Sequence, residues 1–220
     1  MIKRIKDAVR EMVGGDGEPK EDIIDLDLAG IDLSKLGLGA PSEPDMRKVG
    51  LFTDITEEKA GDIIHGLFYL NELNQCAPTQ KARKPIEFYI STYGGSADDM
   101  FAIYDVMKQI QKETEIHTIG LGKVMSAGVL LLSAGTQGKR QIAKNCRIMI
   151  HSVMAVSHGS LHNLLNEIEA IEQLQEMYIN CMVENTTISK SQLKKMLERK
   201  VNIYLSAEEA VEYGIADIII

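Results

Sequence analysis

The residues in this chain that best suit covalent chemistry are one serine, Ser126, and one histidine, His151. Ser126 lies in the stretch GLGKVMSAGVLLLSAG, and His151 ends the apolar stretch RIMIH, which predicts a β-strand. A serine hydroxyl becomes a nucleophile when a nearby imidazole takes its proton. The pair is therefore compatible with acyl transfer. A serine at the start of a Gly- and Ala-rich helix is more often a cap or a packing residue, and a lone histidine at a strand end is usually structural.

A pair of glycines, Gly94-Gly95, follows another predicted strand and could serve the same chemistry. Glycine lacks a Cβ, so a substrate backbone can lie close to the chain there. The peptide N–H groups of Gly95 and Ala127 could then converge on one developing oxyanion, which is usually the largest stabilising effect in acyl transfer. The surroundings of the serine are not the G-x-S-x-G elbow, because Val124 occupies the place of the first glycine. They are not a G-x-x-x-x-G-K-[ST] phosphate loop either.

Strands and helices alternate from the predicted start of the core, near Arg47. Apolar runs predict strands, and apolar residues at helical spacing predict helices, including a short one that is apolar on all sides. This alternation predicts an α/β fold with a mainly parallel sheet, whose active site lies where strands end and helices begin. The predicted strands are 48–53, 86–91, 115–122, 147–153 and 215–220, and the predicted helices are 57–74, 97–112, 126–135 and 160–185.

Composition excludes several classes of function. The chain has 220 residues and a net charge of -8, which argues against non-specific binding to nucleic acid. It has no apolar run long enough to span a membrane and no secretory leader. Its three cysteines are widely spaced and form no CxxC pair, so neither a disulfide framework nor a metal site is expected. We expect a cytoplasmic protein that needs no cofactor.

Residues 1–45 are expected to form an appendage to a core domain that covers 46–220. The first thirteen residues, MIKRIKDAVREMV, place apolar side chains on one helical stripe among basic ones, so they form either a docking helix or a frayed terminus. The stretches GGDGEPKED and LGLGAPSEPD are typical of linkers. The appendage is therefore predicted to be dispensable for folding of the core.

Four collinear stretches resemble one known family. FYISTYGGSADDMFAIYD, MSAGVLLLSAGTQGKR, NCRIMIHSV and YLSAEEAVEYGIAD are similar, in this order, to motifs of ClpP, the proteolytic subunit of the Clp protease. The resemblance runs from about Lys48 to Asp217. It implies the ClpP/crotonase fold, with repeated β-β-α units, a mainly parallel sheet and a protruding handle helix at about 160–186.

The resemblance also implies roles for individual residues. Ser126 would be the nucleophile, His151 the general base, and the N–H groups of Gly95 and Ala127 the oxyanion hole. Asn202 stands where the family has the aspartate of its catalytic triad. Family members form heptameric rings, stacked in pairs as tetradecamers around a closed chamber. An AAA+ unfoldase supplies them with unfolded polypeptides.

Three departures make the chain an atypical member. Asn202 replaces the triad aspartate, Val201 and Asn202 replace an Arg–Asp pair that links the two rings, and Gln75–Pro85 lengthens a loop where unfoldases dock. The leading hypothesis is a self-compartmentalising serine endopeptidase. The alternatives are a weak or inactive structural subunit of a mixed ring, and a crotonase-type enzyme that acts on acyl-CoA thioesters.

Overall fold

A computed structural model of the chain describes residues 46–198 and 202–220. The predicted appendage at 1–45 and the departure at Val201 lie outside these residues. None of the described helices is both long enough and apolar enough to cross a membrane. The elements, in chain order, are β1 (Lys48–Leu51), α2 (Glu57–Gln75), the 3-10 turn η3 (Gln80–Ala82), β2 (Ile86–Thr92), α3 (Ala97–Ile110), β3 (Ile116–Met125), α4 (Ala127–Ser133), β4 (Gln141–Ile142), β5 (Arg147–Ile150), α5 (Leu161–Asn185), α6 (Lys190–Glu198), β6 (Ile203–Leu205), α7 (Ala207–Glu212) and β7 (Ile218–Ile219).

The strands form one mixed sheet that is mostly parallel, which confirms the predicted fold class. Its main order is β1-β2-β3-β4-β7, and β5 branches from β3 and pairs with β6. The first half of β3 pairs with β4 and its last three residues pair with β5, so this ten-residue strand supports both branches. Among the described strands, only the β5–β6 pair is antiparallel. The carboxyl end of β3 therefore lies beside the carboxyl end of β5, where an α/β fold builds its sites.

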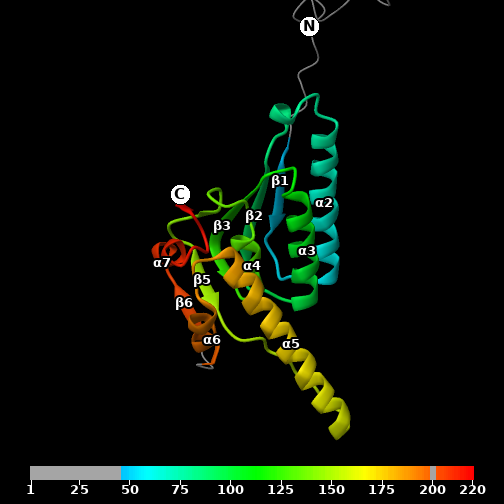
Figure 1. Cartoon of the computed structure of the whole chain (residues 1–220), viewed down its shortest axis with the longest axis vertical. Helices are drawn as coiled ribbons and strands as arrows, with labels where there is room; N and C mark the ends of the chain where they lie inside the picture. The colour runs from blue at the N-terminus through cyan, green and yellow to red at the C-terminus, as the bar shows by residue number, and fades with distance from the viewer. Residues whose placement is uncertain (1–45, 199–201) are drawn as a thin grey trace, which may run out of the picture. The chain divides into compact units, whose positions relative to one another are not determined.

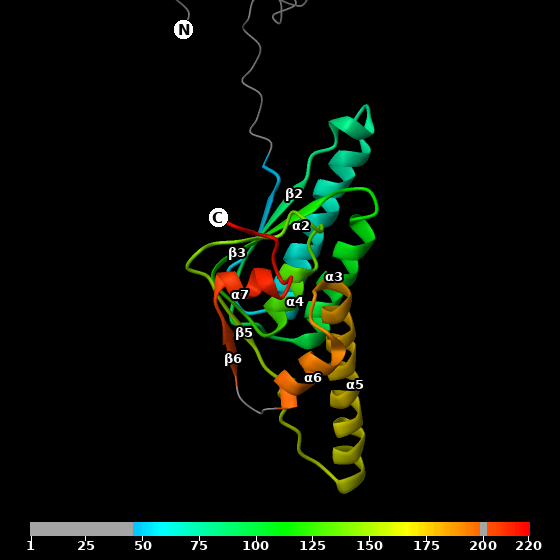
Figure 2. The same cartoon turned by 60° about the vertical axis from the view of Figure 1, so that its left-hand side comes forward.

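Helices α2 and α3 lie side by side against the sheet (Figures 1 and 2). Thr56 caps α2 by accepting the Lys59 N–H, and Ser96 caps α3 by accepting the Asp99 N–H. Both helices bury one apolar stripe, as their sequence periodicity predicts. The cap of α3 fixes the chain immediately after Gly94-Gly95.

Helix α4 is the centre of the core. All seven of its residues are buried, in agreement with a stretch that is apolar on every side. The helix packs on β2, β3 and β5 and also contacts α3 and α5. Gly128 allows the close approach, because a Cβ there would lie 2.5 Å from Thr92 Cγ2. The residue that precedes α4 is consequently held by the most rigid part of the molecule.

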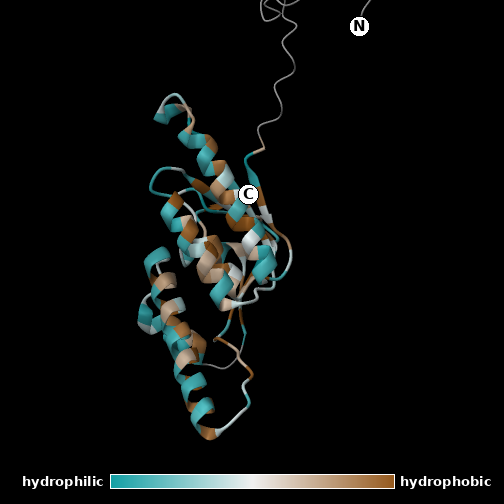
Figure 3. Ribbon diagram, turned by 90° about the vertical axis from the view of Figure 1, so that its right-hand side faces the viewer, coloured by the Kyte–Doolittle hydropathy of each residue, from teal (hydrophilic) through white to brown (hydrophobic). Residues whose placement is uncertain are grey.

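Helix α5 projects away from the sheet (Figures 1 and 2). Its carboxyl-terminal half packs on the core, where Tyr178, Ile179 and Met182 are buried. The first half leaves apolar side chains open to solvent: Leu161 is 68% exposed and Leu165 is 55% exposed. Figure 3 shows these apolar residues alternating with polar ones along the projecting part.

An ion pair between Arg140 and Asp217 connects the carboxyl-terminal segment to the core. Arg140, which is 3% exposed, bonds both carboxylate oxygens of Asp217, through Nε at 2.8 Å and Nη2 at 2.5 Å. Burial alone would raise the pKa of Asp217, but the hydrogen bonds and the charge of Arg140 outweigh it and lower the pKa. Gly214 follows the end of α7 and has φ 67°, a conformation that glycine adopts readily.

Several element boundaries differ from the predictions. β3 continues to Met125 instead of ending near Gly122, and the strand expected at 147–153 ends at Ile150. β4 and β6 were not predicted, because two- and three-residue strands carry too little periodicity to be recognised. Ser206 forms both bonds of a capping box with Glu209 at the start of α7. At Ser189, the described residues show one bond of this kind, in which the Ser189 hydroxyl accepts the Gln192 N–H.

Candidate active site

Ser126 occupies a sharp turn between β3 and α4. Its backbone has φ 54° and ψ -125°, and no other described non-glycine residue has a positive φ. Such a conformation costs about 1–3 kcal/mol and is typical of functional sites. The side chain makes no capping hydrogen bond with α4 and is half-buried. The geometry therefore does not support the helix-cap interpretation of this serine.

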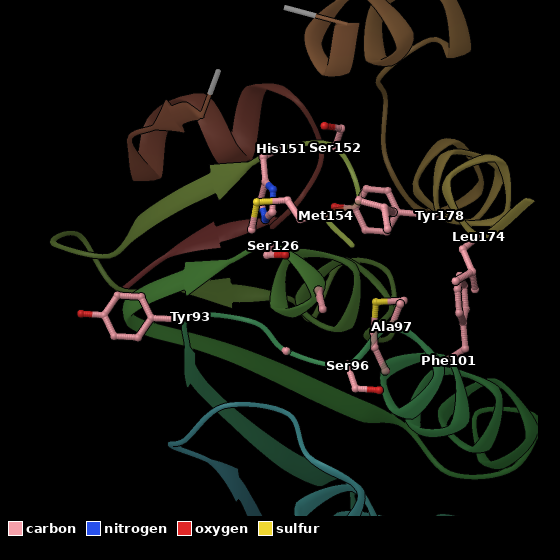
Figure 4. A pocket seen from close by; sticks show the side chains of 14 residues that line it. Tyr93, Ser96, Ala97, Phe101, Ser126, His151, Ser152, Met154, Leu174 and Tyr178 are labelled. Atoms are coloured by element: carbon pink, nitrogen blue, oxygen red, sulfur yellow. The ribbon is translucent and has the colours of Figure 1, made fainter. Parts of the chain in front are cut away.

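A backbone hydrogen bond fixes this turn to the neighbouring strand. The Ser126 N–H donates to the Met149 carbonyl at 2.8 Å, and Met125 and Met149 are partners in the β3–β5 ladder. His151 follows Met149 by two residues, just past the end of β5. In Figure 4 the imidazole of His151 points from the end of β5 toward Ser126. The two side chains proposed for acyl transfer thus project from adjacent, hydrogen-bonded strand ends.

The two glycines after β2 are required by close contacts. Gly94 has φ 110°, and a Cβ there would lie 2.7 Å from the Ser126 Cβ. Gly95 has φ 145°, and a Cβ there would lie 2.2 Å from the Ile55 carbonyl oxygen. Ile55 donates its N–H to the Gly94 carbonyl at 2.7 Å and accepts the Ser96 N–H at 3.0 Å. In this parallel bridge, the N–H of Gly95 itself points away from Ile55.

The N–H of Ala127 is a second donor at the same site. Ala127 is the first residue of α4, so its N–H precedes the first hydrogen bond of the helix, which runs from Val129 N–H to the Ser126 carbonyl at 3.0 Å. Helix amino termini favour negative charge near such groups. Gly95 and Ala127 both line the cavity beside Ser126.

A cavity of about 310 Å³ opens beside Ser126 and extends between α3 and α5 (Figure 4). None of its lining residues is a lysine, arginine, aspartate or glutamate, so the cavity is largely apolar with a few polar groups. Among the described residues, no cluster of acidic, histidine or cysteine side chains could hold a metal ion. The lining residues are Tyr93, Gly95, Ser96, Ala97, Met100, Phe101, Ser126, Ala127, His151, Ser152, Val153, Met154, Leu174 and Tyr178.

Asn202 does not line this cavity, but the strand register places it next to His151. In the antiparallel β5–β6 ladder, Ile148 faces Leu205, and Ile150 faces Ile203. One step further, His151 and Asn202 take opposite positions, and opposite side chains lie on the same face of a sheet. Asn202 is exposed and His151 is half-buried. Among the described residues, no hydrogen bond joins the His151 ring to Ser126 or Asn202; such bonds are often long before substrate binds.

The three cysteines, whose thiols could also act as nucleophiles, lie outside this cavity. Cys146 is buried in the core, and burial raises the pKa of its thiol to about 11. Cys76 is exposed at the end of α2 and Cys181 lies on α5, and neither lines the cavity. Ser126 is therefore the candidate nucleophile that shares a cavity with a histidine.

Comparison with known proteins agrees with this geometry. The family model described as Clp protease matches residues 44–220. The chain is 32% identical over 174 residues to the ATP-dependent Clp protease proteolytic subunit 1 of Prochlorococcus marinus (strain MIT 9312), which covers 79% of this chain and 84% of the relative. It is 35% identical over 173 residues to the ATP-dependent Clp protease proteolytic subunit 1 of Tropheryma whipplei (strain Twist), covering 78% of each. The chain therefore belongs to the Clp protease family and has the ClpP fold.

The cavity also contains residues from the apolar faces of two helices. Met100 and Phe101 belong to α3, and Leu174 and Tyr178 belong to α5. All four line the cavity beside Ser126. Helical periodicity predicts which face is covered, but it cannot distinguish contact with the core from contact with a cavity. No sequence signal separated these residues from ordinary core residues.

Proposed function

We propose that this chain is a serine endopeptidase subunit that hydrolyses peptide bonds of unfolded polypeptides. The observation that carries the proposal is the strained backbone of Ser126, which holds its hydroxyl at the mouth of a cavity shared with His151 and the N–H of Gly95. A scaffold has no physical need for this strain. Membership of the Clp protease family supports the same class of reaction.

The proposed reaction follows from these positions. The Ser126 Oγ attacks the carbonyl carbon of the scissile peptide while His151 accepts the hydroxyl proton. The negative charge that develops on the carbonyl oxygen is stabilised by the N–H groups of Gly95 and Ala127. His151 then donates the proton to the leaving amine, and water releases the acyl group by the same steps in reverse. Asn202 accepts a hydrogen bond from the histidine ring and orients it without supplying a charge.

We further propose that the chain works as an oligomer. The first half of α5 exposes Leu161, Leu165 and Ile168, each more than half accessible to solvent. Burial of such side chains stabilises an interface by about 25 cal/mol per Å² of apolar area. The expected assembly consists of seven-membered rings, stacked in pairs through α5, that receive polypeptides from an AAA+ unfoldase. The relatives named above are subunits of ATP-dependent proteases.

The same proposal places the protein in the cytoplasm. Its three cysteines are unpaired, and their thiols persist in a reducing compartment.

Native mass measurement at micromolar concentration tests the assembly: a seven- or fourteen-chain species is expected. Detection of monomers or dimers alone would contradict the seven-membered ring.

Peptide hydrolysis with matched serine variants tests the catalytic proposal. Ser126→Ala and His151→Ala should each abolish turnover of a fluorogenic peptide by the assembled protein. Ser152→Ala is the control, because it removes a hydroxyl next to the histidine to which the proposed reaction assigns no step. Equal loss in all three variants would contradict the assignment of Ser126.

One observation favours a second candidate function. His151 has an uncharged residue at the opposite position, so the imidazolium formed during attack receives less stabilisation than a carboxylate would give. A structural subunit that assembles with active relatives would fit this arrangement. In that case, Ser126→Ala would leave the activity of a mixed assembly unchanged.

A further inference from the structure

The hydroxyl of Tyr178 is a buried polar group without a partner. Tyr178 lies on the packed half of α5 and is 7% exposed, and its hydroxyl oxygen makes no hydrogen bond with any described residue. A buried polar group that lacks a partner is costly, so native proteins rarely keep one without a use. Burial also raises the pKa of Tyr178, which keeps the hydroxyl protonated and able to donate.

This hydroxyl belongs to the cavity beside Ser126. Figure 4 shows it directed away from α5, toward the side of the cavity on which His151 and Met154 lie. Met100, Phe101 and Leu174 give the same lining apolar surface, and it also holds the polar side chains of Ser96 and Ser152. Among the described residues, the Tyr178 hydroxyl is the buried side-chain polar group that has no partner. A polar group placed in this way fixes the orientation of a ligand.

We infer that Tyr178 selects the substrate side chain that precedes the cleaved bond, and that it favours a long, uncharged side chain ending in a carbonyl oxygen, as in glutamine. This inference rests on the proposed peptidase function. The acyl group attacked by Ser126 carries that side chain, and the cavity is the space next to the serine in which it can lie. The side-chain amide oxygen of glutamine would accept the hydrogen bond from the Tyr178 hydroxyl.

Because no lysine, arginine, aspartate or glutamate lines the cavity, an uncharged polar substrate side chain is favoured over a charged one. A glutamate carboxylate would be buried among apolar walls without a cation, and a lysine ammonium would be buried without an anion. Both are strongly unfavourable. A methionine side chain has a similar length and no strong acceptor, so it fits the cavity but leaves the hydroxyl unpaired.

One side chain of the lining, Met154, can adapt to a bound substrate. Met154 is 79% exposed, lies in the irregular segment after β5, and in Figure 4 is placed between His151 and the Tyr178 hydroxyl. Methionine has three rotatable bonds and adapts easily to irregular gaps. A substrate side chain can therefore displace it from the cavity.

Paired peptides measure this selectivity in the full-length protein. Two fluorogenic peptides differ only in Gln or Met before the cleaved bond, and kcat/KM is measured for each with wild type and Tyr178→Phe. The Gln/Met ratio should fall about tenfold in the variant, because the glutamine amide loses its buried partner. Tyr104→Phe is the matched control: it removes a tyrosine hydroxyl that bonds Asn185 outside the cavity, and it should leave the ratio unchanged.

Covalent labelling separates this inference from the proposed function. Peptidyl phosphonates with a Gln-like or a Met-like side chain should modify Ser126, and Tyr178→Phe should slow only the Gln-like probe, about tenfold. If both probes label the serine and their ratio is the same in wild type and Tyr178→Phe, the inference is wrong and the peptidase function stands. If neither probe labels the assembled protein and neither peptide is hydrolysed, both are wrong.

Discussion

Replacing Asn202 by aspartate tests how the histidine is oriented. Asn202 and His151 take opposite positions one step past the β5–β6 ladder, where Cβ atoms are typically about 4.5–5.5 Å apart. Two unit charges about 4 Å apart attract by about 1 kcal/mol in water and about 4 kcal/mol at an effective dielectric constant of 20. Asn202 is exposed, so the value near that of water applies. About 1 kcal/mol of extra stabilisation of the imidazolium corresponds to a rate about five times higher.

The assay is hydrolysis of a fluorogenic peptide by Asn202→Asp between pH 5 and 9. We expect kcat/KM to rise about fivefold on the alkaline plateau. The acid limb should move to higher pH, because a carboxylate favours the protonated imidazole. Asn180→Asp adds the same charge at an exposed position of α5 outside the cavity and should change neither quantity. If Asn202→Asp leaves the profile unchanged while Ser126→Ala abolishes turnover, Asn202 does not orient His151 and its assignment is wrong.

Three further predictions concern the packing around the site and the carboxyl-terminal segment. Gly94→Ala should abolish turnover and lower the melting temperature, since its Cβ would meet that of the nucleophilic serine at 2.7 Å; unchanged turnover would contradict this contact. Asp217→Asn should lower the free energy of unfolding in urea by about 3 kcal/mol, because it leaves Arg140 buried without its charge partner. Folding lowers the pKa of Asp217, so the stability that this ion pair contributes is present above about pH 4. That stability is lost as the pH falls through the lowered pKa. Equal acid sensitivity of wild type and Asp217→Asn would refute this prediction. Without ligand, Tyr178→Phe should keep or raise the melting temperature, because the Tyr178 hydroxyl has no partner among the described residues. Tyr104→Phe should lower the free energy of unfolding by about 1 kcal/mol, because the Tyr104 hydroxyl accepts a hydrogen bond from Asn185. Equal losses of stability in the two variants would show that the Tyr178 hydroxyl is hydrogen-bonded.

The fold could be predicted from the sequence wherever periodicity is strong. The long stripes of α2, α3 and α5 and the wholly apolar α4 were assigned correctly because burial of their apolar faces determines these helices. Strands of two or three residues, such as β4 and β6, were not predicted. Their existence depends on pairing with distant segments, which a local pattern does not encode.

Four of the expected site residues lie together in the structure, but the sequence did not predict the geometry of their surroundings. Ser126, His151, Gly95 and Ala127 stood at expected strand and helix junctions, and all four line one cavity. The left-handed backbone of Ser126 could not be predicted, because it is imposed by the bond from its N–H to β5. The unpaired hydroxyl of Tyr178 also depends on tertiary packing, since a tyrosine on an apolar helix face usually finds a partner.

The most direct test of the peptidase assignment is the mass of the intact protein after exposure to a fluorophosphonate. The account predicts one adduct per chain, located on Ser126 by peptide mapping and formed much more slowly in His151→Ala. An assembled protein that acquires no adduct, or acquires it on another serine such as Ser152, would contradict the assignment of Ser126 as the nucleophile.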